Sequence, residues 1–432
     1  MTADSYNTVL PNGIRLTFIP AAKFKTISMA LFIHQELSAE KATLTALLPS
    51  VLERGSRLYP DNLALRRALE ELYGAELSTD VHKKGERHLI SCSLEMIHGK
   101  HVGENGQMLR RGLSILGGLM GDPLVVDGGF KDSYVAQEKE QLANLIRGLI
   151  NDKALYAVER CLQNMCARER YGVFKYGQIA DLEKISPVSL WRYYREILSA
   201  NPAELYIVGD LDASRVEEAA RETVHFHRGP QGDGLPETEV YFEPSEARFV
   251  EERLPVEQAK LVMGYRTNIA YRDPLYIALL VYNGILGSFP HSKLFLNVRE
   301  KAGLAYYVYS RLERHKGILL ISAGIDGSKY EKVRQIIEQQ VEAMARGQIS
   351  DVELENTRRG LINQLRAGED NPYQFINRQL DSEIGGKLYT TDEMIRGIEE
   401  IGPGEIKAAA EKVRLDTVYL LQGGERTVPH GH

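Results

Sequence analysis

Runs of alternating apolar and polar residues open the chain. Residues 8–21, TVLPNGIRLTFIPA, and residues 25–34, KTISMALFIH, have this character. A period of two is typical of β-strands, so the pattern predicts two strands joined by a turn. Residues 75–96, AELSTDVHKKGERHLISCSLEM, predict a hairpin that turns at Lys83–Gly85.

Helical patterns lie between and after these strands. Ser38 and Asp61 stand at expected N-cap positions, before helices that end at Gly55 and Gly74. The sequence then predicts two longer helical tracts, at about 103–119 and 132–165, and a helix followed by an apolar strand over 185–212.

The same order of patterns returns in the second half. An alternating run over 246–267 precedes a predicted helix over 274–286, a hairpin over 304–326 and a helix from Tyr330, and residues 401–425 resemble 185–212. We therefore expect an α+β fold of two homologous domains, each an antiparallel sheet packed with helices.

The boundary between the predicted domains is a polar segment. Residues 227–246 are rich in glycine, proline and acidic residues, which favours a semi-extended linker. The predicted domains are thus 1–226 and 247–432. A linker of this length either lets the domains close over something between them or acts as a plain spacer.

Composition favours a soluble protein. The chain has 432 residues, is 43% hydrophobic and 26% charged, and carries a net charge of −6, which argues against nucleic acid or an anionic membrane as partner. We expect no signal peptide and no transmembrane helix. The three cysteines, Cys92, Cys161 and Cys166, are sparse, so we expect a reducing, cytoplasmic location.

The most specific motif is HSKLFLNVREKAGLAYYV, residues 291–308. With LPNGIRLTFIP (10–20), LPSVLERGS (48–56) and VGDLD (208–212), it resembles the pitrilysin/insulinase family of zinc peptidases. That family includes the mitochondrial processing peptidase subunits. QEKEQLANLI and the residues after it resemble a zinc-less bacterial subgroup of the family, which is associated by name with modification of elongation factor P.

The resemblance implies roles for Arg299 and Tyr306, which lie seven positions apart (306 − 299 = 7). In the family, this pair binds the substrate backbone and stabilises the tetrahedral intermediate. A guanidinium and a phenol suit the task because both donate hydrogen bonds to a developing oxyanion. The alternative is an idle surface arginine and a strand tyrosine.

The resemblance also assigns the glycine-rich run from Gly284 to Ser292. In some members of the family this loop recognises substrate, so Gly284, Gly287 and Ser288 are the candidate substrate-binding residues. A helix–helix turn is the alternative reading of the same run.

The zinc motif of the family is missing. Active members carry His-x-x-Glu-His on a helix, and alignment on VLERGS places Ala46, Pro49 and Ser50 at those positions. The third ligand position falls on Leu145, with Glu138 upstream. The chain therefore predicts no metal of its own, and the resemblance implies zinc in a partner subunit.

Three functions follow as alternatives. The first is a zinc-less subunit that pairs with a zinc-bearing paralogous peptidase subunit and a peptide or protein substrate, and pairs with itself when alone. The second is a non-enzymatic peptide-binding or structural core protein. The third is a hydrolase with a rebuilt site, which we disfavour because His98/His101 and His225/His227 have no nearby base in a helical arrangement.

Overall fold

The computed structural model describes residues 5–104, 107–224, 226, 228–229 and 234–424. Packing divides the chain into two compact units. Unit 1 comprises 1–147, 173–237 and 371–380; unit 2 comprises 148–172, 238–370 and 381–432. No helix of the described residues is long and apolar enough to cross a membrane.

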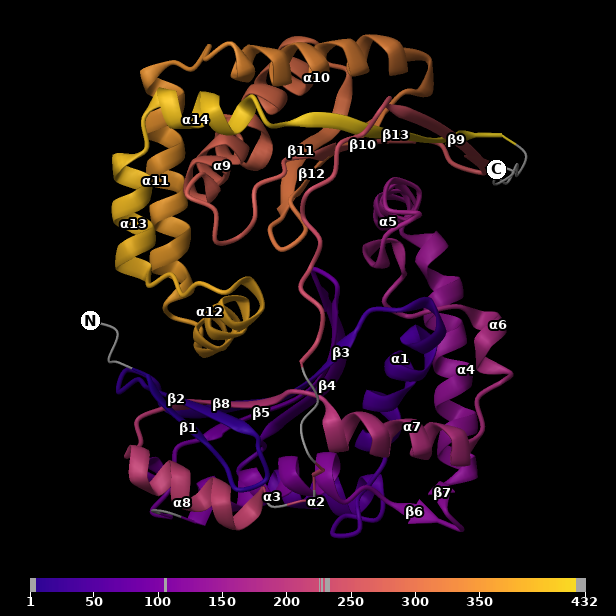
Figure 1. Ribbon diagram of the computed structural model, residues 1–432, viewed down its shortest axis with the longest axis vertical. Helices are drawn as coiled ribbons and strands as arrows, with labels where there is room; N and C mark the ends of the chain where they lie inside the picture. Colours follow the sequence, from indigo (N-terminus) through magenta and orange to yellow (C-terminus); the bar gives the residue numbers. More distant parts are fainter. Residues whose placement is uncertain (1–4, 105–106, 225, 227, 230–233, 425–432) are drawn as a thin grey trace. The chain divides into compact units, whose positions relative to one another are not determined.

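Unit 1 is built on a six-stranded sheet with the order β1-β2-β8-β3-β5-β4 (Figure 1). Its strands are β1 Tyr6–Val9, β2 Arg15–Pro20, β3 Thr26–Glu36, β4 Glu76–Lys84, β5 Arg87–Ile97 and β8 Ala203–Gly209. A small hairpin joins β6 Val125–Val126 to β7 Gly129–Phe130. Its helices are α1 Ala39–Glu53, α2 Asn62–Glu70, α3 Gln107–Gly121, α4 Asp132–Gly148, α6 Ile179–Leu182, α7 Pro187–Ala200 and α8 Ala213–Thr223, with a 3₁₀ turn η1 at Gly99–His101.

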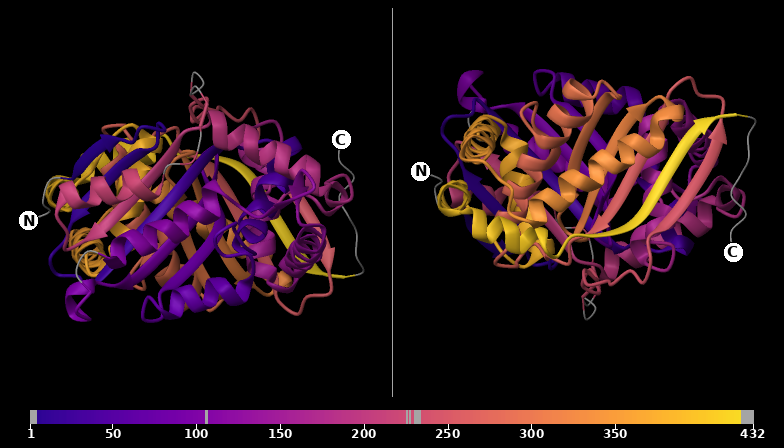
Figure 2. Two further views of the ribbon diagram at one scale, coloured as in Figure 1. Left: turned by 90° about the horizontal axis from the view of Figure 1, so that it is seen from below. Right: turned by 90° about the horizontal axis from the view of Figure 1, so that it is seen from above.

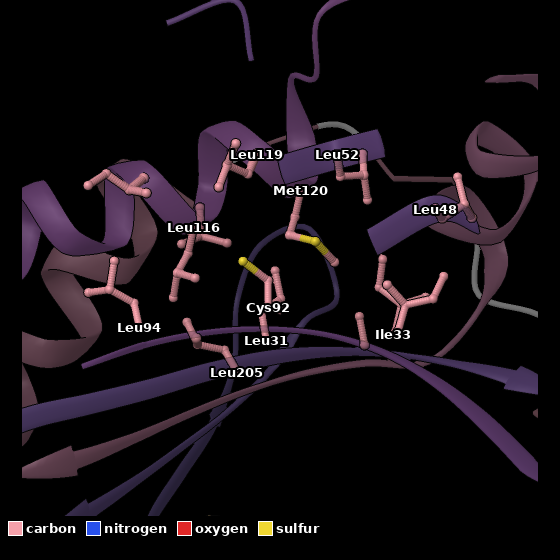
Figure 3. Close-up of a cluster of buried hydrophobic side chains, with 14 of the residues drawn as sticks. Leu31, Ile33, Leu48, Leu52, Cys92, Leu94, Leu116, Leu119, Met120 and Leu205 are labelled. Carbon is pink, nitrogen blue, oxygen red and sulfur yellow. The ribbon is translucent and has the colours of Figure 1, made fainter. Parts of the chain in front are cut away.

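The core of unit 1 lies between one face of this sheet and the helices. Figure 3 shows leucines of α1 and α3 meeting Leu31, Cys92 and Leu205 of the strands. These three side chains are fully buried because alternate residues of β3, β5 and β8 point to the helical side. The predicted period of two thus gives this sheet its inner face.

Unit 2 carries a five-stranded sheet with the order β11-β12-β10-β13-β9. Its strands are β9 Arg248–Leu254, β10 Ala259–Arg266, β11 Ala305–Glu313, β12 Ile318–Ile325 and β13 Arg414–Gly423. Its helices are α5 Lys153–Met165, α9 Tyr276–Asn283, α10 Tyr330–Ala345, α11 Asp351–Gly368, α13 Thr391–Glu400 and α14 Pro403–Ala410. The 3₁₀ turns η2 Leu149–Asn151, η3 Arg170–Gly172 and η6 Gly327–Lys329 and the π-helices η4 Gly284–Ser288 and η5 Phe295–Lys301 complete it.

Helices cover both faces of the second sheet. The helix α10 packs in the main core of unit 2, and α5 packs on the opposite face (Figure 1). The right view of Figure 2 shows α10, in orange, crossing the strands. A strand buried on both faces is apolar at successive positions, and β12, ILLISAGI, has this composition.

The two sheets share one topology, as the repeated sequence pattern predicts. The order β2-β8-β3-β5-β4 in unit 1 corresponds to β9-β13-β10-β12-β11 in unit 2. Antiparallel pairs predominate in both sheets, as expected, and each sheet also contains one parallel pair, β2 with β8 and β13 with β9. Both sheets are therefore mixed.

Two segments pack away from their sequence neighbours. Residues 148–172 belong to unit 2 and residues 371–380, the first part of α12 Pro372–Gly385, belong to unit 1. The single helical tract expected over 132–165 is broken, because Asp152 caps a new helix by accepting bonds from the amides of Ala154 and Leu155. The division of the chain into domains 1–226 and 247–432 stays a prediction.

Candidate functional site

Arg299 lies in the last turn of η5, a π-helix. Gly303 ends this helix with a positive φ of 62°, and its amide donates to the carbonyl of Arg299 at 3.1 Å. The guanidinium lies 4.8 Å from the ring centre of Phe295, and its Nε is 3.9 Å from the Glu300 carboxylate. The side chain is 45% exposed, and its ionic contact with Glu300 is long and therefore weak.

Tyr306 is the extra residue of a β-bulge. The register of β11 on β12 runs from Ala305 opposite Ile325 to Tyr307 opposite Gly324, which leaves Tyr306 without a partner. Its side chain is 69% exposed. Because β11 is an edge strand, the bulge presents the phenol outward at an open edge of the sheet.

The glycine-rich run is helical and largely buried, not a loop. Gly284 and Gly287 lie in η4, where an added Cβ would meet Thr357 Cγ2 at 2.4 Å and Ser310 Oγ at 2.5 Å. These glycines therefore let η4 pack closely against α11 and β11. Ser288 is exposed, and its hydroxyl accepts a bond of 2.6 Å from Asn283. Substrate binding by these three residues stays a prediction.

These elements form one region, which we call the β11 corner: η4, η5 and residues 305–310 of β11. The strand packs against both π-helices. π-Helices are rare and often lie at functional sites, and β-bulges commonly redirect a side chain beside an active site. All five predicted site residues thus lie in a region where the regular backbone geometry of unit 2 is interrupted.

A second region surrounds the three positions of the lost motif. Ala46 is buried in α1, Pro49 lies inside the same helix, and Ser50 lines a cavity of about 510 Å³. We call this the α1–α4 cavity; its lining residues are Ser50, Glu53, Arg54, Asn62, Leu65, Arg66, Leu69, Ala75, Leu77, Glu138 and Gln141.

The expected third ligand position, Leu145, does not reach this cavity. Its side chain is 51% exposed and lies outside the lining. Glu138, seven residues earlier in α4, does line it. The alignment of Leu145 with the third ligand position stays a prediction.

Glu138 is held by an arginine that sequence reasoning missed. Arg54 Nε donates to Glu138 Oε1 at 2.5 Å, its Nη2 contacts the same oxygen, and Gln141 donates to it at 3.3 Å. The carboxylate is 5% exposed. The ion pair thus cross-links the end of α1 to α4. The signal was present in the two segments LERGS and QEKEQ, but nothing in either one pointed to the other.

Comparison with known proteins now gives the family. The profile described as "Peptidase M16 inactive domain" matches residues 184–361. A protein of Bacillus subtilis, named probable inactive metalloprotease YmfF, is 36% identical over 96% of both chains. The chain belongs to the M16 peptidase family. It is an inactive, peptidase-like member by these matches.

Other proteins are similar to this chain in sequence or fold. The uncharacterised zinc protease YmxG of Bacillus subtilis is 24% identical over 54% of this chain and 56% of its own. A conserved protein from Enterococcus faecalis superposes with a TM-score of 0.90 at 29% identity, covering 99% of this chain and 100% of its own. An M16 inactive domain from Pseudomonas fluorescens, at 18% identity and a TM-score of 0.82, covers 99% and 100% and shows the shared fold.

The residues of this M16 chain do not fit the zinc of active members. Ala46 and Pro49 supply no ligand atom. Of the two acids that line the cavity, Glu138 is paired with Arg54 and Glu53 accepts a hydrogen bond from Thr79. Across the described residues, no group of three or more histidines, cysteines or acids is placed to hold a metal. His98 instead bonds the Asp210 carbonyl, and His225 and His227 lie outside the described residues.

Proposed function

We propose that this chain is the zinc-less subunit of a heterodimeric M16 metallopeptidase. Arg299 and Tyr306 bind the peptide backbone and stabilise the tetrahedral intermediate at the zinc site of a paralogous partner. The observation that carries the proposal is the β11 corner, where a bulge and a π-helix hold two hydrogen-bond donors exposed and largely unengaged.

The chemistry follows from the donors. Attack on a peptide carbonyl builds negative charge on its oxygen, and a donor aimed at that charge lowers the barrier by about 2.7–4 kcal/mol. Arg299 offers a planar fork of N–H groups and Tyr306 offers one O–H. The described residues contain no ligand set for the metal step, so in this proposal the partner subunit supplies the zinc and its bound water.

Reconstitution tests the proposal. We expect this chain, mixed with its zinc-bearing paralogue, to support peptide cleavage, and Tyr306→Phe to lower turnover on the order of a hundredfold while complex formation is unchanged. Tyr241→Phe is the matched control, because Tyr241 is also exposed, at 66%. Wild-type turnover by a fully assembled Tyr306→Phe complex would refute the assignment.

A second candidate function rests on the α1–α4 cavity. The strand β4 is an edge strand, and Leu77 of β4 lines the cavity. A peptide that paired with β4 would place side chains there without being cut, because extended peptides add readily to open sheet edges. Peptide affinity without any paralogue, abolished by Leu77→Arg but not by Arg299→Ala, would favour this non-enzymatic function.

Three further expectations belong to the proposal. A cytoplasmic location rests on the sparse, buried cysteines Cys92, Cys161 and Cys166. The association with elongation factor P modification rests on the resemblance of the sequence to the zinc-less bacterial subgroup alone. Self-pairing of this chain in the absence of its partner is the remaining expectation, and the oligomeric state of the purified chain tests it.

A further inference from the structure

Segment 148–172 comes from the first half of the chain but packs as part of unit 2. The helix α5 lays an apolar stripe on the second sheet. The stripe consists of Ala157, Val158, Cys161, Leu162 and Met165, and it packs with Val250, Leu254, Val262, Ile318, Leu320, Tyr419 and Leu421. An apolar stripe alone would allow α5 to slide or rotate, so the polar contacts at its two ends decide its register.

The first polar cluster lies near the start of α5. Glu252 of β9 is 2% exposed and accepts bonds from Tyr156 Oη at 2.6 Å, Arg160 Nε at 3.0 Å and Tyr419 Oη at 2.7 Å. Burial alone would raise the pKa of Glu252, but these donors outweigh burial and lower that pKa. The sheet thus offers a buried carboxylate, and α5 supplies two of its donors.

The second polar cluster lies beyond the end of α5. Here the second half of the chain supplies the buried cations, and segment 148–172 supplies the carboxylate. Arg266 and Lys316 of the second half are fully buried. Glu169 accepts from Arg266 Nη2 at 2.6 Å and Nη1 at 3.0 Å, and lies 2.8 Å from Lys316 Nζ. Asp416 accepts from Arg266 Nε at 2.9 Å, and the Met165 carbonyl from its Nη2 at 3.1 Å.

Glu169 is therefore the carboxylate that two buried cations share. Burial alone would raise the pKa of Glu169, but its bonds to Arg266 and Lys316 lower it. Removing one partner from a buried charged cluster is strongly destabilising, because the remaining charges stay out of water without compensation. The second half of the chain, taken without residues 148–172, would leave both cations without this partner.

We propose that this face of the second sheet is an interaction surface for a helix of defined chemistry. The matching helix carries a tyrosine and an arginine at its start, an apolar stripe, and a carboxylate beyond its end. In this chain the occupant is segment 148–172. The segment thereby fastens residues 247–432 to residues 1–226 without help from the linker.

A cut chain tests this proposal. A protease site inserted after Gly234, which is exposed, allows the folded full-length chain to be cleaved in the linker. We expect the two fragments to elute together in size-exclusion chromatography at micromolar concentration. We expect Glu169→Gln to weaken their association on the order of a hundredfold, whereas Glu331→Gln, at an exposed acid of α10 on the opposite face of the sheet, leaves it unchanged.

Tyr156→Phe is a milder variant, to be used if uncut Glu169→Gln fails to fold. It keeps every charge and the ring but removes one bond to Glu252. We expect an association about tenfold weaker, in line with a hydrogen bond to a charged group. Separation of the cut wild-type fragments would overturn the proposal. So would cut Glu169→Gln and Tyr156→Phe chains that hold together as firmly as wild type.

Discussion

The α1–α4 cavity and the β11 corner have opposite chemistry. At the cavity the polar groups are bonded to one another, since Arg54 and Gln141 donate hydrogen bonds to Glu138. At the corner, Arg299 and Tyr306 stand exposed on irregular backbone. The difference is between polar groups that are paired within unit 1 and two exposed hydrogen-bond donors in unit 2, and we propose that only the exposed donors act on a substrate.

The largest expected effect concerns metal removal, because a chain that holds a structural zinc would respond to it and this chain should not. We expect a chelator to leave the free energy of unfolding unchanged and metal analysis to find far less than one zinc per chain, because the ligand positions hold Ala46, Pro49 and Ser50. A structural zinc would contribute on the order of 10 kcal/mol, and its removal would be obvious in a melting curve. One tightly held zinc, lost on changing Ser50 or Glu138, would break the comparison.

The ion pair at the cavity comes next. We expect Arg54→Met to lower the free energy of unfolding by about 3 kcal/mol, because the buried Glu138 then loses its cation. The double variant Arg54→Met, Glu138→Leu should recover part of the loss, since no buried charge remains. Arg57→Met, at an exposed arginine, is the control for denaturant unfolding. Equal free energies of unfolding for Arg54→Met and wild type would show that the ion pair does not stabilise the fold.

Glu204 is another buried carboxylate of unit 1, and its pairing can be tested by measuring stability as a function of pH. Burial alone would raise the pKa of Glu204, but bonds from His34, Arg15 and Tyr206 lower it to about 2 from 4.5. A depressed pKa stabilises the fold above the unfolded value. Stability should therefore fall by about 3 kcal/mol as pH drops from 4.5 towards 2. Glu204→Gln should flatten this part of the profile, and an unchanged profile would contradict the pairing.

Packing beneath the corner should show a smaller effect. We expect Gly287→Ala to cost about 1–3 kcal/mol, because its Cβ would lie 2.6 Å from the backbone nitrogen of Ser310, which has little room to move. Gly404→Ala is the matched control: nothing lies within 4 Å of its added Cβ, and alanine favours the helix by about 0.5–1 kcal/mol. Thermal melts that rank the two variants the other way would contradict the close approach of η4 to β11.

The repeated strand order was predictable because it rests on local patterns. Alternation, the Asp61 cap and the hairpin turn at Lys83–Gly85 each act within a few residues, and each appears in the structure. Ser38 holds its N-cap position, although its side chain makes no capping bond.

Features that depend on distant partners were not predictable from one sequence. The break at Asp152 matters because α5 packs on the strands of the other half. The pairing of Arg54 with Glu138 joins residues 84 positions apart.

One kinetic comparison tests the central claim most directly. In complexes reconstituted with the zinc-bearing paralogue at matched stoichiometry, Arg299→Ala alters the β11 corner and Ser50→Ala alters the α1–α4 cavity. The account predicts that turnover falls on the order of a hundredfold or more for Arg299→Ala, that Arg299→Lys is also impaired, and that Ser50→Ala stays close to wild type. Loss of turnover with Ser50→Ala and wild-type turnover with Arg299→Ala would contradict it.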